Sequence, residues 1–203
     1  MKGDRRKEQI LTAALRLFAG RGYHAATVAD IVAEMGVARG TFYRYFRDKH
    51  DLFGQLLESN FRYVKKVLPA MPEDSSLTAA DLEAVLAQGF RELLSRPDSR
   101  DFLTMMVNQA AAADPFFAAK IVAFYDDLAE VFAGYIVRFQ TRGLLEPREP
   151  KAAAYLLLGA VREIFLQWAR GGKFKDLEAL THEVASFLVY GLKGKTPAGP
   201  ARR

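Results

Sequence analysis

Apolar residues recur along the chain at the spacing of amphipathic helices, and no segment alternates apolar and polar residues as a surface strand does. In the first segment, about residues 4–19, the apolar positions follow an i, i+1, i+4, i+7, i+8 order that places them on one helix face. Asp4 is expected to cap this helix, and Gly20 and Gly22 are expected to end it. The pattern predicts an all-α protein.

Two short helices and a longer one are predicted next. Thr27 is a candidate N-cap for the second helix, because Asp30 completes a capping-box-like pattern with it. Gly36 ends that helix, since the turn needs a positive φ that glycine adopts at little cost. The third helix is expected at about 38–45, and Asp48 is expected to cap the fourth.

Proline and glycine residues divide the rest of the chain into five further helices, about nine in all. Pro69–Ser76 is expected to form a loop, and residues 194–203 a disordered tail. We therefore expect a three-helix domain in residues 1–48 and a larger helical domain in residues 49–193. The five further helices are predicted at about 78–95, 99–113, 115–142, 149–171 and 176–192.

The positive charge of the chain is concentrated near its N-terminus. The whole chain of 203 residues has a formal charge of +5, whereas residues 1–66, with 13 Lys/Arg and 7 Asp/Glu, have a charge of +6. Such an excess suits a polyanion partner, although a solvated basic face is the alternative. The chain has no cysteine, no signal sequence and no apolar run of about 18 residues, so we expect a cytoplasmic protein without a membrane span.

The stretch from Thr27 to Phe53 has the layout of a helix-turn-helix, in which two short helices meet at a glycine turn. The second helix of such a motif enters the major groove of duplex DNA. Arg39 can donate two hydrogen bonds to guanine, and the methyl group of Thr41 can contact a thymine methyl. Phe42 and Phe46 recur at i and i+4 and are expected to face the core. The motif predicts a DNA-binding domain.

The sequence of this stretch, TVADIVAEMGVARGTFYRYFRDKHDLF, resembles the DNA-binding signature of the TetR family of bacterial repressors. The similarity extends over about residues 8–57 and includes Phe18, Gly22 and Tyr23. Val32 and Met35 stand where the family commonly has alanine, and both are expected to be internal. From about residue 68 onward, the chain resembles the family only in the number and size of its helices.

The resemblance implies a role for individual residues of the motif, although Tyr43 and Tyr45 have a core position as an alternative. A cation at a helix N-terminus is unfavourable beside the helix dipole, so Lys49 is expected to have a phosphate partner rather than none. The basic residues between Lys2 and Lys7 are either an arm on the DNA backbone or a solvated terminus. The implied base-contacting residues are Arg39, Gly40, Thr41, Arg44 and Tyr45, and the implied phosphate-binding residues are Thr27, Tyr43 and Lys49.

Two predicted helices, at Pro150–Arg170 and Leu177–Leu192, have more apolar surface than one neighbour would cover. Members of the TetR family pair the equivalent helices into a four-helix dimer interface, and a central place in a monomer core is the alternative. A two-fold dimer also reads two half-sites about 34 Å apart, whereas one recognition helix reads only a few base pairs. The expected interface residues are Leu157, Val161, Ile164, Leu177, Leu180, Val184, Phe187 and Leu188.

The resemblance also implies a small-molecule pocket within the middle helices. Methionine and aromatic side chains form adaptable apolar cavities, although the same residues at helical spacing are ordinary core. Asn108, Gln109 and Arg162 are polar residues on otherwise apolar helices and are candidates to orient a ligand. Ligands of the family are often lipophilic or aromatic, acyl thioesters among them. The apolar candidates and their neighbours are Phe90, Met105, Met106, Phe124, Tyr125, Leu128 and Trp168.

No pattern in the sequence predicts an enzyme. The three histidines, His24, His50 and His182, are not accompanied by a nucleophile motif, and no zinc-protease, Walker or dinucleotide-binding pattern is present. We therefore expect no catalytic residue, no metal and no cofactor other than a small-molecule effector. The predicted protein is a homodimeric repressor of palindromic operator DNA that a lipophilic or aromatic ligand releases. The alternative is an architectural DNA-binding protein without ligand control.

Overall fold

The computed structural model describes residues 2–68, 78–108, 115–146, 149–171 and 173–191, and within these ranges it contains nine helices and no strand. The expected loop at Pro69–Ser76, the expected tail at 194–203 and the end of the helix predicted at 99–113 lie outside the described residues. The helices are α1 (Lys2–Arg21), α2 (Val28–Glu34), α3 (Arg39–Tyr43), α4 (Lys49–Val67), α5 (Ala79–Leu94), α6 (Ser99–Asn108), α8 (Pro115–Gln140), α9 (Pro150–Ala169) and α10 (Leu177–Gly191).

The first helix begins earlier than predicted. It starts at Lys2, so Asp4 lies inside it and the prediction that Asp4 caps it is wrong. The apolar pattern could not fix this start, because residues 2–9 are polar and most of them are good helix formers that extend the helix beyond its buried face. At the other end, Gly22 adopts a φ of 90° and donates its N–H to the carbonyl of Phe18 at 3.0 Å.

The helix-turn-helix forms as the sequence predicts. Thr27 caps α2 in a complete capping box with Asp30. Gly36 adopts a φ of 61°, and the N–H of Val37 bonds the carbonyl of Val32 at 3.1 Å, which satisfies a carbonyl at the end of α2. The third helix is shorter than predicted, because its end tightens into a turn in which the N–H of Tyr45 bonds the carbonyl of Phe42 at 3.0 Å.

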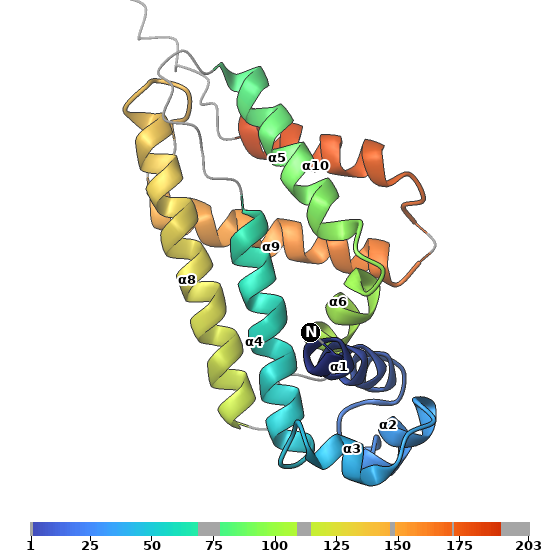
Figure 1. Ribbon diagram of the computed structural model, residues 1–203. Coiled ribbons are helices and arrows are strands. Elements are labelled where there is room, and N and C mark those ends of the chain that lie inside the picture. The colour runs from blue at the N-terminus through green and yellow to red at the C-terminus, as the bar shows by residue number, and fades with distance from the viewer. Residues whose placement is uncertain (1, 69–77, 109–114, 147–148, 172, 192–203) are drawn as a thin grey trace, which may run out of the picture.

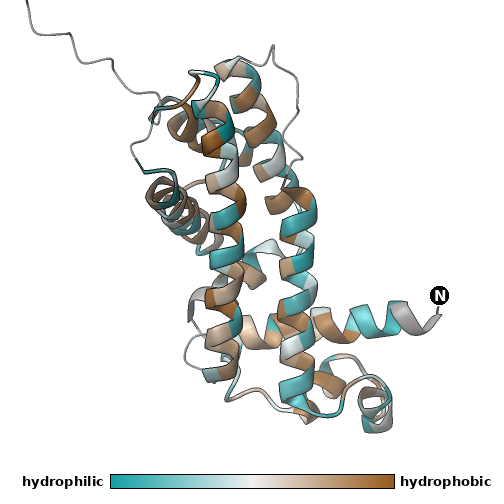
Figure 2. Cartoon of the chain, turned by 90° about the vertical axis from the view of Figure 1, so that its left-hand side faces the viewer, coloured by the Kyte–Doolittle hydropathy of each residue, from teal (hydrophilic) through white to brown (hydrophobic). Residues whose placement is uncertain are grey.

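The helices pack around two apolar clusters. One cluster, here called the head core, joins α1, α2, α3 and the first half of α4, with Phe18, Ile31 and Phe42 fully buried. The other joins α5, α8, α9 and α10. Figure 1 shows the head at the base of the molecule, with α4 and α8 rising from it side by side. In Figure 2, α1 projects sideways from this base and becomes hydrophilic toward its N-terminal end.

The head core extends beyond the three N-terminal helices. Met105 of α6 and Phe117 of α8 are fully buried within it, beside Leu52 and Phe53 of α4. The ring of Phe117 lies 4.6 Å from that of Phe53 and 5.8 Å from that of Tyr23. Three helices of the larger part of the chain are therefore anchored in the head.

Helix α9 is long and apolar enough, by composition alone, to cross a membrane. Its Ala154, Leu158 and Phe165 side chains are buried in the core of the protein. Glu149 caps the helix through the N–H groups of Lys151 and Ala152, and Pro150 occupies the first turn, where no hydrogen-bond donor is needed. Burial in this core accounts for only part of the apolar composition of α9, because Leu156 of the same helix is exposed.

Candidate functional site

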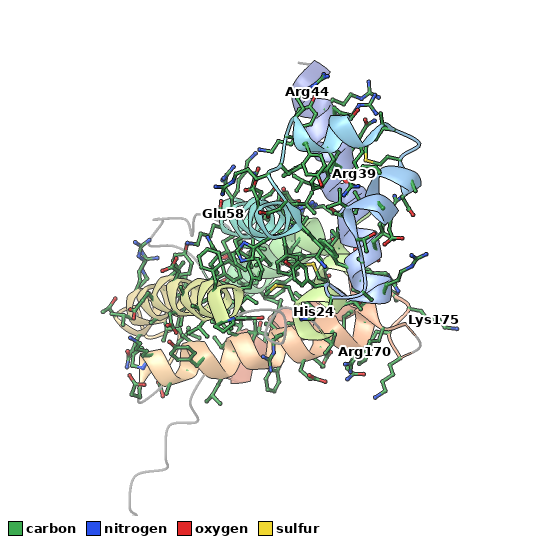
Figure 3. All side chains as sticks on the ribbon, turned by 90° about the horizontal axis from the view of Figure 1, so that it is seen from below. His24, Arg39, Arg44, Glu58, Arg170 and Lys175 are labelled. Atoms are coloured by element: carbon green, nitrogen blue, oxygen red, sulfur yellow. The ribbon has the colours of Figure 1, made fainter. Side chains whose placement is uncertain are left out.

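The surface of α3 presents the side chains that the motif assigns to DNA bases. Arg39, Gly40 and Arg44 are exposed, and Figure 3 shows Arg39 and Arg44 on the N-terminal helices, away from α8 and α9. Nothing lies within 4 Å of the position that a Cβ would take on Gly40, so the backbone there is open to a close approach from outside. The arrangement can donate hydrogen bonds to an acceptor that approaches α3.

Tyr43 is not a core residue, because 48% of it is exposed. The guanidinium of Arg39 lies 5.8 Å from the centre of its ring, and Arg39 Nη2 donates to the Tyr43 hydroxyl oxygen at 3.4 Å. This long contact leaves the phenol hydrogen of Tyr43 to donate elsewhere. The alternative of a core position is therefore wrong for Tyr43.

Thr41 and Tyr45 are less accessible to a DNA base than the sequence predicts. Both are half-buried, and Tyr45 packs against the head core in which Phe42 and Phe46 are buried. The short helix explains the position of Tyr45, because the turn after Tyr43 carries it out of the α-helical register assumed for it. Both positions thus lie between the exposed side chains of α3 and the core.

Thr27 is committed to the capping box. Its hydroxyl donates to Asp30 Oδ2 at 2.6 Å and accepts from the N–H of Asp30 at 3.1 Å. The hydrogen bonds from Thr27 hold the pKa of Asp30 below its usual range. A phosphate at the start of α2 would compete with this carboxylate for the donors of Thr27.

Lys49 has partners within the protein. Its ammonium donates to the carbonyl oxygens of Tyr23 at 2.7 Å, Ala26 at 2.9 Å and His24 at 3.3 Å, and it lies 4.4 Å from the centre of the Tyr23 ring. An ammonium has three N–H donors, so this arrangement leaves none for a phosphate. Burial lowers the pKa of Lys49. From the sequence, a phosphate or no partner are the two alternatives for Lys49. The structure instead provides backbone carbonyls from a loop 23 to 26 residues earlier in the chain.

An apolar cavity of about 110 Å³ lies between α4, α5, α6, α8, α9 and α10. Its wall includes six of the ten residues predicted for a pocket, and its apolar character agrees with the prediction. Asn108 and Gln109 cannot be placed, because the side chain of the first and the whole of the second lie outside the described part of the chain. The six that line it are Phe90, Met106, Phe124, Tyr125, Leu128 and Arg162.

Two residues predicted for the pocket lie elsewhere. Met105 is fully buried in the head core, because it lies on the opposite side of α6 from Leu103, which lines the cavity. Trp168 is buried near the end of α9, and the guanidinium of Arg100 lies 4.2 Å from the centre of its ring. Both are core residues at helical spacing, the alternative that the sequence left open.

Several residues of the predicted dimer interface are enclosed within the chain itself. Leu180, Val184 and Leu188 are buried, so they cannot contact a partner as predicted. Leu157 and Val161 line the cavity, as does Leu188, while Ile164 and Leu177 pack against the cluster that joins α5, α8, α9 and α10. The apolar stripes of α9 and α10 are so wide that the sequence does not reveal which edge faces outward.

Other apolar side chains of the same two helices face solvent. Leu156 is 75% exposed and Phe187 64% exposed, and Tyr155 and Tyr190 are also exposed. Of these four residues, only Phe187 is among the expected interface residues. Leu156, Leu157 and Leu158 are consecutive leucines, so no local signal in the sequence distinguishes the exposed one from the others.

The chain is similar to known regulatory proteins. Residues 10–56 match the family model for bacterial regulatory proteins of the tetR family. The chain is 26% identical over 190 residues to the fatty acid metabolism regulator protein of Bacillus subtilis, covering 92% of this chain and 95% of that protein. It is 26% identical over 192 residues to the transcriptional repressor BepR of Brucella suis, covering 92% and 91%.

A solved structure has the same fold. The crystal structure of FadR from Bacillus subtilis in complex with stearoyl-CoA superimposes with a TM-score of 0.71 at 24% identity, covering 91% of this chain and 98% of that one. The helix-turn-helix with its exposed α3, the matched family model and the shared two-part helical fold agree with one another. Residues 10–56 of the chain thus match the DNA-binding part of the tetR family of bacterial regulatory proteins, and the whole chain has the fold of the FadR regulator.

Proposed function

We propose that the protein is a homodimeric repressor that binds palindromic operator DNA through α3 and releases it when a small lipophilic ligand enters the apolar cavity. The observation that carries the proposal is that two side chains belong both to the lining of the cavity and to the head core. Phe102 and Met106 of α6 line the cavity and also pack against the head core. A molecule that displaces them acts directly on the packing of the DNA-binding helices.

A second connection runs along α8. Phe117 at its start is buried in the head core, and Phe124 and Leu128, two and three turns later, line the cavity. The ring of Phe124 stacks on Phe61 of α4 at 3.9 Å. A displacement of α8 at the cavity therefore reaches the head through a continuous helix and through α4.

The small size of the cavity supports a change in protein conformation when a ligand binds. A cavity of roughly 150 Å³ holds one benzene ring, and the cavity here is about 110 Å³. A longer apolar ligand must therefore push the surrounding helices apart. A ligand shifts an equilibrium only when it binds the two states with different affinities, and an enlarged cavity supplies that difference.

The proposed partner at α9 and α10 is a second copy of the chain. The exposed Leu156 and Phe187 would be covered in such a dimer, and two copies of α3 would read two half-sites of one operator. DNA as the target also implies a cytoplasmic protein. Repression by the BepR relative and the stearoyl-CoA bound to FadR support the proposed action and the apolar ligand.

The test measures ligand and operator together. A duplex is first selected in vitro with the wild-type protein, and its release on addition of stearoyl-CoA is followed by fluorescence anisotropy. We expect release from the wild type and none from Leu128→Trp, which fills the cavity, while both proteins bind the duplex equally without ligand. Unchanged operator affinity in the presence of bound stearoyl-CoA would refute ligand control.

A further inference from the structure

The cavity has one polar edge. Of the described residues that line it, only Tyr125 of α8 and Arg162 of α9 carry a polar group. Arg162 is exposed, whereas Tyr125 is half-buried, so the pair lies between the apolar interior and the solvent. A ligand that fills the apolar interior must place its head group beside these two side chains.

The guanidinium of Arg162 has N–H donors that can bind a ligand. This guanidinium lies near enough to the Tyr125 hydroxyl to act on the pKa of that phenol, and among the residues that the structure describes no carboxylate lies within ion-pair distance of it. A guanidinium has five N–H donors and no acceptor, so most of its donors remain available. A phenol hydroxyl both donates and accepts, so Tyr125 adds an O–H donor beside the guanidinium.

Tyr125 remains a donor at neutral pH. Burial raises the pKa of its phenol above the usual value, an effect that Arg162 opposes only in part. The two side chains therefore present O–H and N–H donors, together with one positive charge, to the same point at the edge of the cavity. This is the chemistry that holds a carboxylate, because a guanidinium binds both carboxylate oxygens in a charge-assisted pair.

We propose that the effector is an anion with an apolar acyl chain, whose head-group oxygens bind Arg162 and Tyr125 while the chain enters the cavity. The inference rests on the proposed ligand control and names the chemical class of the ligand. A fatty carboxylate and an acyl thioester of coenzyme A share this chemistry, because each joins an acyl chain to acceptor oxygens and negative charge. A cationic amphiphile is disfavoured, since Arg162 would repel its head group.

The experiment compares four ten-carbon probes by isothermal titration calorimetry on the whole chain: decanoate, decanoyl-CoA, decanol and decyltrimethylammonium. We expect decanoate or decanoyl-CoA to bind wild-type protein about 10 to 100 times more tightly than the other two, since a bond to a charged group is being added. Whichever of these two binds more tightly identifies the source of the acyl chain.

The variant Arg162→Met should remove this preference and leave the affinity for decanol unchanged. Arg170→Met is the matched control, because Arg170 is exposed at the end of the same helix and does not line the cavity. Tyr125→Phe should weaken the anionic probes only. Equal binding of decanol and both anionic probes, or an anionic preference that survives Arg162→Met, would overturn the proposal and leave ligand control intact. Failure of all four probes to bind would overturn both.

Discussion

Lys49 at the start of α4 has two candidate roles: it supports the loop before α2 through backbone carbonyls, or it binds a DNA phosphate. Replacement of Lys49 by methionine tests which role it has. Methionine keeps most of the length and apolar stem of the side chain but removes the ammonium, so the carbonyls of Tyr23, His24 and Ala26 lose their common donor. These carbonyls belong to the segment that joins α1 to α2. We expect the variant to loosen that segment and, with it, the position of the helix-turn-helix.

The magnitude follows from the hydrogen bonds. The bonds to Tyr23 and Ala26 are partly buried, and at the lower limit for a bond to a charged group, about 1.5 kcal/mol each, they contribute about 3 kcal/mol. The bond to His24 is exposed, and water replaces it, so it is counted as zero. For a chain of this size, each kcal/mol lowers the melting temperature by about 2–4 °C, so the expected fall is about 6–12 °C.

The assay combines thermal unfolding, followed by circular dichroism, with the salt dependence of binding to the selected duplex. Arg47→Met is the matched control, because its side chain is 88% exposed and its loss removes the same charge two residues away. A phosphate contact contributes about 0.9 to the slope of log K against log salt. An unchanged melting temperature for Lys49→Met together with a slope reduced by that amount would refute the structural role and restore the phosphate contact.

Three further predictions concern the other surfaces. Arg39→Ala should weaken operator binding by about 1–3 kcal/mol and relax the preference at one base pair, measured by competition with singly substituted duplexes; an equal loss on random DNA would make Arg39 a phosphate contact. Leu156→Asp should convert the dimer to a monomer in sedimentation experiments, whereas Val122→Asp, which alters an exposed residue of α8, should not; a dimer in both would place the interface elsewhere. Phe117→Leu should retain probe binding but weaken operator release, whereas Phe116→Leu, at the half-exposed neighbour, should respond as the wild type does; equal responses would remove α8 from the coupling path.

The helix-turn-helix could be predicted because its signals are local. The capping box of Thr27 and Asp30, the positive φ of Gly36 and the cap at Asp48 each depend on residues a few positions apart, and the structure contains all of them. The spacing of Phe42 and Phe46 likewise fixed which side of the motif is buried. Local hydrogen bonds and one amphipathic period are sufficient for this part of the fold.

The partners of Lys49 and the residues of the cavity depend on distant segments. The carbonyls that bind Lys49 lie 23 to 26 residues before it, so no local pattern reveals them. On α6, Met105 and Met106 are neighbours in sequence, yet one is buried in the head core and the other lines the cavity. Which edge of an apolar helix meets which neighbour is decided by the packing of whole helices, and the sequence of one helix does not contain it.

Helix α9 connects the two regions on which the proposed regulation depends. Leu156 faces solvent at the proposed dimer surface, and the next two residues, Leu157 and Leu158, line the cavity. A ligand that enlarges the cavity therefore acts on the same turn of helix that would contact the partner subunit. Linkage is reciprocal, so a ligand that alters this contact must itself bind with an affinity that depends on dimerisation. We expect the affinity for the acyl probe to differ between wild type and Leu156→Asp, and equal affinities would show that cavity and dimer surface are energetically independent.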